Sequence, residues 1–342
     1  MRLSDYDFDL PRHLIAQEPA PKRDESRLLV LDRRDGSIRH MIFHEIVSLL
    51  SAKDVMMLNQ TRVFPARIFG FRPDTGGRVE LLLIRQYSDR VWLAMGKPAG
   101  ALKPGQKIAL SSGGKPVVVK KRTPRGRILI EFECDEVMSL LETDGVLPLP
   151  PYINRAVTAN DTKRYQTVFA KTMGAIAAPT AGLHFTEKLF KGIGQIGTAI
   201  APVLLHVGPG TFEPVRSIDP KDHEIEEEYY EVNNTSAEIV NQARAVGGRA
   251  IAVGTTVVRA VESSSSVGGI LNASKGFTNS FIFPPYKFKC VDVLVTNFHL
   301  PKSTLLMLVA AFAGYENLMT AYREAIEQEY RFYSYGDAMV IL

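Results

Sequence analysis

The sequence predicts an α/β fold in which both ends of the chain form one large domain and a small all-β domain is inserted after Thr61. Three observations lead to this prediction. The 342 residues correspond to about two domains, because a domain typically takes ~150 residues. Apolar runs typical of buried strands alternate with helical patterns in both flanks, which is α/β patterning. The stretch between the flanks is rich in short strand patterns and strongly basic.

The N-terminal flank is expected to supply a helix at residues 43–50 and a short buried strand at 55–58. Strand patterns follow, separated by turns rich in glycine, proline and aspartate, at 63–70, 78–85, 91–95, 116–122 and 127–133. Short strands at this spacing predict a small antiparallel barrel or sandwich. A helical pattern at 135–142 and a linker with three prolines at 145–152 end this stretch.

The C-terminal flank continues the alternation. Strands are expected at 199–206, 250–253 and 291–296, and helices at 236–245, 256–263, 303–312 and 316–330. We therefore expect residues 1–61 and 152–342 to form the large domain, and residues 62–151 to form the inserted basic β domain.

The two parts of the chain also differ in net charge. Residues 62–130 carry 15 Lys or Arg against three acids, a local net charge of +12, and the rest of the chain has a net charge of −8. Lysines that protect the edges of a sheet are the alternative explanation. The excess is larger than edge protection requires, so binding of a phosphate backbone is favoured.

Composition excludes several classes of protein. With 45% hydrophobic and 23% charged residues, the chain is neither disordered nor a coiled coil. Cys134 and Cys290 are the only cysteines, which excludes a disulfide scaffold and a cysteine-rich zinc module and fits a reducing cytosol. No signal peptide is visible, and the longest apolar run, at 305–313, is far short of the ~20 residues that span a bilayer. We expect a cytoplasmic protein without membrane association.

Polar residues cluster where predicted strands end, which is where α/β sheets bind ligands. The candidate substrate-binding residues at these junctions are Thr180, Gly182, His206, Gly208, Gly210, Thr211, Thr255, Thr256, Thr296 and Asn297, accompanied by His184 and His299. Tight turns, packed histidines and ordinary capped helices remain alternative interpretations. The helix that follows Gly254 offers free N–H groups to an anion. Arg259 and Glu262 lie three residues apart on the same face of this helix, so that they could pair.

An acidic segment at residues 223–228 places four glutamates beside His223. Such a run is usually a solvated face. A metal site is less favoured, because no second histidine stands at ligand spacing, and we expect no metal.

Taken together, these segments resemble one family, the S-adenosylmethionine:tRNA ribosyltransferase-isomerases of queuosine biosynthesis. The resemblance includes the motif His206-Val207-Gly208-Pro209-Gly210-Thr211-Phe212 and extends over almost the whole chain. The other similar segments are 7–11, 14–19, 58–67, 147–153, 164–170, 177–185, 254–256, 296–307 and 330–339. Two positions depart from the family pattern. Glu226 replaces the second histidine of a His-x-x-His-x-Glu motif, and Pro285 stands where glycine is usual.

The resemblance implies a large α/β domain with a β-barrel core and surrounding helices, plus a small inserted β domain. It also implies that the ribosyl group of S-adenosylmethionine, a co-substrate, is transferred and isomerised. The acceptor would be tRNA that carries 7-aminomethyl-7-deazaguanine at the wobble position. The products would be epoxyqueuosine in the tRNA, adenine and methionine.

Carried onto this chain, the resemblance implies roles for particular residues. His184 or His299 would transfer protons, with Glu228 or Glu262 as the carboxylate partner. Thr255, Thr256 and Arg259 would hold the methionine carboxylate. Asn59, Thr61, Arg62 and Arg67 lie where the insert joins the large domain and would meet the anticodon loop.

Two other classes of protein stay open from the sequence. A tRNA methyltransferase uses the same co-substrate, but no Gly-x-Gly-x-x-Gly follows an N-terminal strand. A non-catalytic RNA-binding protein would not need the clusters of His, Thr and Asn at strand ends.

Overall fold

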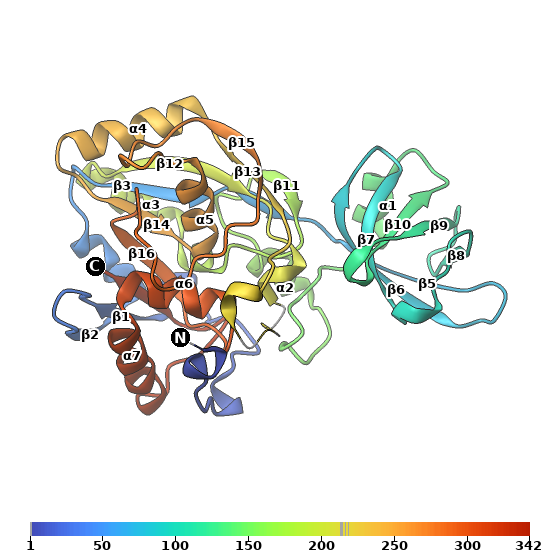
Figure 1. Cartoon of the computed structure of the whole chain (residues 1–342), viewed down its shortest axis with the longest axis horizontal. Coiled ribbons are helices and arrows are strands. Elements are labelled where there is room, and N and C mark those ends of the chain that lie inside the picture. The colour runs from blue at the N-terminus through green and yellow to red at the C-terminus, as the bar shows by residue number, and fades with distance from the viewer. Residues whose placement is uncertain (1, 213–214, 216, 218) are drawn as a thin grey trace.

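The computed structural model describes residues 2–212, 215, 217 and 219–342. It contains a large α/β domain built around a nine-stranded sheet and a six-stranded closed barrel beside it (Figure 1). The α/β class with an inserted β module, expected from the sequence, is therefore confirmed.

The sheet combines strands from both ends of the chain. Its strands are β1 (Arg27–Leu31), β2 (Ile38–Ile42), β3 (Val55–Asn59), β12 (Ala199–Leu205), β13 (Glu228–Val232), β14 (Ala250–Val253), β15 (Ser274–Thr278), β16 (Val293–Asn297) and β17 (Ala338–Ile341). They lie in the order β15-β13-β12-β3-β14-β16-β17-β1-β2. The central strands β12, β3, β14 and β16 run parallel. Their carboxyl ends therefore meet at one edge of the sheet, where ligands of α/β proteins bind.

Helices cover both faces of this sheet. One face carries α4 (Asn234–Ala245), α5 (Thr255–Ser264), α6 (Thr304–Ala313) and α7 (Tyr315–Glu327), and the other carries α3 (Glu187–Ile196) and the short helical turns η4 (Phe43–Leu49) and η7 (Thr180–His184). Strand β3 contributes to the core under both layers of helices, because alternate side chains of a strand point to opposite faces of the sheet. Val55 and Met57 pack against the first layer, and Met56 and Leu58 pack against the second. Two smaller helices are α1 (Val137–Asp144) and α2 (Ala159–Arg164).

Within the described residues, no single helix is long and apolar enough to cross a membrane. The helices α6 and α7 reach the required length and hydropathy only as a pair that bends by 115°.

The inserted module is an antiparallel barrel with its own core. Its strands are β5 (Arg67–Phe71), β6 (Arg78–Gln86), β7 (Val91–Lys97), β8 (Lys107–Leu110), β9 (Val117–Arg122) and β10 (Ile128–Phe132), closed in the order β10-β7-β6-β5-β8-β9. Val79, Leu81 and Leu83 alternate with more exposed residues along β6, so one face of the strand fills the barrel. Five of these strands match the expected positions, and β8 was not expected.

The position of the barrel differs from what the resemblance implied, which was a barrel core in the large domain. The closed barrel is the insert, and the large domain has an open sheet whose outermost strands among the described residues are β15 and β2. Because helices already bury both faces of this sheet, it has no need to close on itself.

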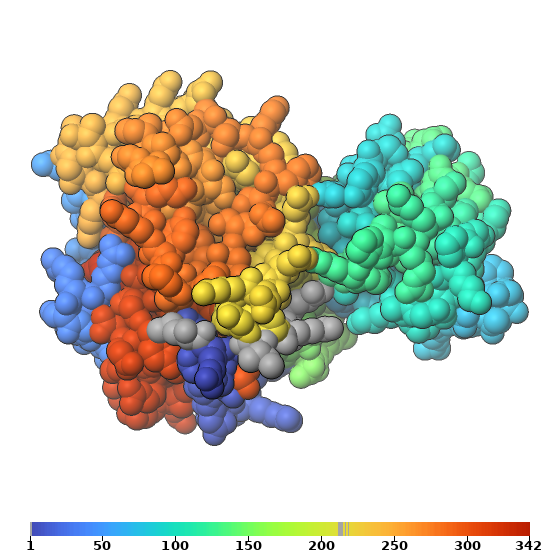
Figure 2. All heavy atoms as spheres, viewed as in Figure 1, coloured from blue at the N-terminus to red at the C-terminus, as the bar shows by residue number. Residues whose placement is uncertain are grey.

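The two parts join at a short parallel pair, β4 (Thr61–Val63) with β11 (Thr172–Ala175). The barrel then projects as a separate lobe (Figure 2). We propose the division into residues 1–61 and 152–342 for the large domain and 62–151 for the insert. Separate hydrophobic clusters in the barrel and in the sheet support this division.

Candidate active site

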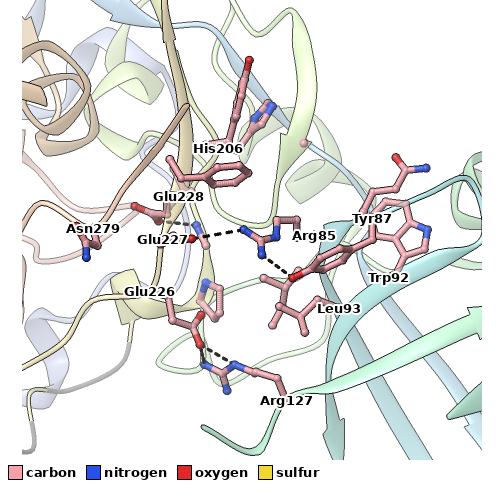
Figure 3. Close-up of a pocket in the computed structure, with 18 of the residues that line it drawn as sticks. Arg85, Tyr87, Trp92, Leu93, Arg127, His206, Glu226, Glu227, Glu228 and Asn279 are labelled. Atoms are coloured by element: carbon pink, nitrogen blue, oxygen red, sulfur yellow. Dashed lines mark hydrogen bonds and ion pairs between the residues drawn. The ribbon is translucent and has the colours of Figure 1, made fainter. Parts of the chain in front are cut away.

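A cleft of about 1090 Å³ lies between the barrel and the large domain (Figure 3). From the barrel it is lined by Arg85, Tyr87, Trp92 and Arg127. From the large domain it is lined by the turn after β12, residues 206–209, and by the acidic segment. A cleft of this size with a few convergent polar groups is typical of a ligand site.

The acidic segment contacts the barrel, although Glu224 and Glu227 are themselves exposed to solvent. Glu226 Oε1 lies 2.6 Å from Arg127 Nη2 and 2.8 Å from Arg127 Nε, and Glu224 pairs with Arg125. Glu227 lies 4.0 Å from Arg85, whose guanidinium also lies over the rings of Tyr87 and Phe277. The expectation of a solvated face therefore holds for Glu224 and Glu227 but not for Glu226 and Glu228, which are withdrawn from solvent. Glu226 stands in place of the family's second histidine, and its ion pair with Arg127 links the large domain to the barrel.

His206 stands at the end of β12 and lines the cleft. Its Nδ1 lies 2.8 Å from Thr61 Oγ1, and its ring stacks on Tyr229 with centroids 5.8 Å apart. A Cβ at Gly174 would lie 2.5 Å from Nε2, so the ring needs a glycine at that position. Burial lowers the pKa of His206 to about 4, and the imidazole is therefore neutral at neutral pH. Nε2 has no hydrogen bond to a described residue.

Glu228 and Arg259 form a buried ion pair beneath this turn, with exposed fractions of 4% and 5%. Glu228 Oε1 also accepts the N–H of Gly208 at 2.6 Å, which fixes the backbone next to His206. Arg259 Nε donates to the carbonyl of Ser280 at 3.0 Å. Arg259 Nη2 is buried and has no partner among the described residues.

Arg259 pairs with Glu228 and not with Glu262, the partner that helix spacing made possible. Glu262 points to the loop before β16, where its carboxylate accepts hydrogen bonds from Tyr286 Oη and from the N–H groups of Lys289 and Cys290 at 2.9–3.1 Å. Glu262 thus fixes a loop, and Arg259 reaches across to β13.

A second, smaller pocket lies at the carboxyl ends of β14 and β16. We call it the threonine pocket, because Thr180, Thr255, Thr256 and Thr296 line it together with Asn297 and His299. Six of the residues expected at strand ends therefore come together here. Val207 lines both this pocket and the cleft, so the two are adjacent.

Asn59 and Thr61 are buried at the join between the domains rather than exposed to a partner. Asn59 Nδ2 donates to the carbonyl of Leu205 and to Thr256 Oγ1, and its Oδ1 accepts the N–H groups of Thr61 and Leu205. These two residues support His206 and the threonine pocket. Arg62 is exposed, and Arg67 pairs with Glu80 on the barrel.

The expected glycines have separate functions. A Cβ at Gly182 would lie 2.7 Å from Phe169, so this glycine permits close packing of η7. Gly208 lies in the cleft, and Gly210 lines a small cavity beside Arg259. Thr211 belongs to the short turn η8 (Pro209–Phe212), and its side chain lies outside the described part of the structure.

The two histidines expected to transfer protons are both buried. His184 Nδ1 contacts Ser26 Oγ at 2.7 Å, and its Nε2 lies 3.2 Å from Asn297 Nδ2. Because that amide nitrogen can only donate, His184 Nε2 accepts and its proton is on Nδ1. His299 Nε2 lies 2.8 Å from Thr296 Oγ1. Burial lowers the pKa of both histidines to about 3.

These pKa values predict a loss of stability in acid. The folded protein keeps His184, His206 and His299 neutral, whereas the unfolded chain takes up protons near pH 6.5. The unfolded state therefore binds more protons, and the free energy of unfolding should fall by about 1 kcal/mol per histidine between pH 7 and 5.5. Urea unfolding at both pH values measures this. The exposed His44, replaced by glutamine, serves as control, and an unchanged free energy of unfolding would contradict the prediction.

Residues of the barrel that line the cleft were missed from the sequence, notably Arg85, Tyr87 and Arg127. Their charge and aromatic character were visible, but nothing local distinguishes them from the other basic residues of the insert. Within the described residues, no group of three or more His, Cys, Asp or Glu side chains is arranged to hold a metal ion.

The fold and the cleft define an α/β protein with an inserted β-barrel and a ligand-sized cleft between the two parts. The family model described as queuosine biosynthesis protein matches residues 3–341, and the chain belongs to this family. It is 48% identical to the S-adenosylmethionine:tRNA ribosyltransferase-isomerase of Desulforamulus reducens and 46% identical to that of Halothermothrix orenii, each over 100% of both chains. The crystal structure of S-adenosylmethionine tRNA ribosyltransferase from Thermotoga maritima is similar, with 35% identity and a TM-score of 0.56 over 99% of this chain and 100% of that one.

Proposed function

We propose that this enzyme is an S-adenosylmethionine:tRNA ribosyltransferase-isomerase. It transfers and isomerises the ribosyl moiety of S-adenosylmethionine, which yields epoxyqueuosine in tRNA and releases adenine and methionine. The observation that carries this conclusion is the full-length match to relatives of that name at 46–48% identity. A large cleft between a domain with polar strand ends and a basic barrel supports it.

The acceptor in this proposal is 7-aminomethyl-7-deazaguanine at the tRNA wobble position, and the reaction takes place in the cytoplasm. The cleft offers both kinds of group that such an acceptor needs. Tyr87 and Phe277 are half-exposed rings on which a base can stack. Arg85, Arg125 and Arg127 of the barrel also line the cleft, and their positive charge suits the phosphates on either side of the base.

The chemistry requires a proton acceptor beside the ribose. The sulfonium makes the hydrogens of the neighbouring 5′ carbon acidic, so a base can form an ylide there, and the acceptor amine must also lose a proton before it attacks. We assign proton transfer to His206, because it lines the cleft and is neutral. If Nδ1–H donates to Thr61 Oγ1, Nε2 is left as the basic nitrogen.

The other residues that the sequence predicted for catalysis have supporting roles in this proposal. Glu228 and Arg259 hold the turn that carries His206, through the bond to the Gly208 N–H. His184 has hydrogen bonds at both ring nitrogens and positions Asn297. His299 lines the threonine pocket and is available as a second proton carrier.

A labelling experiment distinguishes this function from methyl transfer to tRNA. A methyltransferase breaks the bond between sulfur and methyl, whereas this reaction breaks the bond between sulfur and the 5′ carbon and also frees adenine. We expect ribose-labelled S-adenosylmethionine to label tRNA, methyl-labelled S-adenosylmethionine to leave it unlabelled, and methionine and adenine to appear in equal amounts.

The control for this experiment is tRNA with guanine at the wobble position, which has no alkyl amine and should gain no label. Methyl label in the RNA, or S-adenosylhomocysteine as the coproduct, would overturn the assignment.

A further inference from the structure

The threonine pocket lies where two helices begin. Gly254, Thr255 and Thr256 at the start of α5 line it, and so do Ser303 and Leu305 at the start of α6. The pocket encloses about 50 Å³. Since a cavity needs roughly 10–15 Å³ to hold one water, the pocket has room for a group of a few heavy atoms and not for a nucleotide.

The start of α5 presents unused donors. The carbonyl of Gly254 accepts the N–H groups of Val257 and Val258, but those of Thr255 and Thr256 have no hydrogen bond within the described part of the chain. No side chain caps this helix. Free N–H groups and the helix dipole together bind an anion such as a carboxylate.

An unused acceptor lines the same pocket. Asn297 is 2% exposed, and its Oδ1 is buried without a partner among the described residues. The orientation of this amide is fixed, because its two Nδ2 hydrogens are donated to the carbonyl of Tyr333 at 3.1 Å and to His184 Nε2 at 3.2 Å. A buried amide oxygen without a donor is costly, and an ammonium group would satisfy it.

The pocket has no formal charge of its own. Its described lining contains no Asp, Glu, Lys or Arg. A group that binds here is therefore recognised by dipoles, and the presence of both donors and an acceptor suits a zwitterion. A phosphate of the RNA would use the donors but leave Asn297 Oδ1 unsatisfied.

We propose that the threonine pocket holds the amino-acid end of S-adenosylmethionine, with the α-carboxylate at the N–H groups of Thr255 and Thr256 and the α-ammonium at Asn297 Oδ1. This inference rests on the proposed function. Since Val207 lines both the pocket and the cleft, the sulfonium and ribose then lie toward His206. Arg259, which pairs with Glu228, does not hold the carboxylate.

The test removes one N–H group and leaves the helix intact. Thr255 is the first residue of α5, where proline is tolerated, and the extended ψ of 151° at Gly254 suits a following proline. Thr255→Pro removes the hydroxyl and the N–H, whereas Thr255→Val removes only the hydroxyl. The difference between the two variants therefore isolates the N–H. Asn234→Pro, at the first position of the remote helix α4, is the matched proline control.

Two inhibitors are measured at saturating tRNA. Free L-methionine carries only the amino-acid end, and 5′-dimethylsulfonio-5′-deoxyadenosine carries only the sulfonium nucleoside. Because a hydrogen bond to a charged group is lost, we expect Thr255→Pro to raise Ki for L-methionine and KM for S-adenosylmethionine about tenfold or more over Thr255→Val. Its Ki for the sulfonium nucleoside and its kcat should change much less.

Three outcomes would overturn the inference: an equal rise for both inhibitors, no difference between the proline and valine variants, or the same rise in Asn234→Pro. Failure of the proposed function would look different. In that case the wild-type enzyme would transfer no ribose label, whatever the inhibitors do.

Discussion

Replacing His206 with glutamine is expected to lower turnover by roughly 10²-fold or more, the usual contribution of a positioned proton-transfer group. Glutamine keeps a hydrogen-bonding side chain beside Thr61 but cannot accept a proton in this pH range. Because the pKa of His206 is about 4, the wild-type enzyme should keep its base form above about pH 5. Single-turnover rates of ribose transfer at several pH values measure both effects.

His44→Gln is the control for this experiment, because His44 is exposed and has no contact with the cleft. His299→Gln tests the second histidine in the same assay. Normal turnover in the His206 variant would show that His206 does not transfer the proton. A loss of turnover confined to His299→Gln would assign proton transfer to His299 in the threonine pocket.

Affinity for tRNA is expected to fall about 10³-fold between 50 and 200 mM salt if the barrel contacts about six phosphates. The insert has the net charge for this, +12 over residues 62–130. Reversing the charge at Arg78, Lys103 and Lys121 should reduce both the affinity and its dependence on salt. These three side chains are exposed and have no ion pair among the described residues. Filter binding or fluorescence anisotropy over a salt series measures the effect.

The matched control reverses Lys188 and Lys191, which are exposed on α3 in the large domain. Thermal unfolding should show that both sets of variants remain folded. If binding responds to neither salt nor the barrel substitutions, or responds equally to the α3 substitutions, the barrel is not the surface that binds tRNA.

Elements with a strong local pattern were predictable from the sequence. Strand β14 and helix α5 lie within a residue or so of their expected positions, because a run of apolar residues, then glycine, then threonines specifies strand, turn and helix start locally. Strand β13 was not expected. Its sequence, Glu-Tyr-Tyr-Glu-Val, has little apolar pattern, and it is a strand because it pairs with β12 and β15.

For the candidate site, the sequence predicted which residues come together but not which of them pair. Residues at strand ends were expected to meet because parallel strands share an edge, and six of them line the threonine pocket. Partners were harder to predict. Glu262 was the neighbour that helix spacing offered to Arg259, but the buried guanidinium reaches Glu228 on another element.

The sequence by itself therefore determined the α/β class, the basic inserted module, the strand ends that carry the polar residues and the family resemblance that the comparisons confirm. The tertiary structure alone decided that the insert is the closed barrel, that His206 faces the cleft, and that Arg127 meets Glu226, a residue 99 positions away. The physical reason is that periodicity and capping act over a few residues. Which charges pair, and which polar groups stay unsatisfied, depends on how distant segments pack.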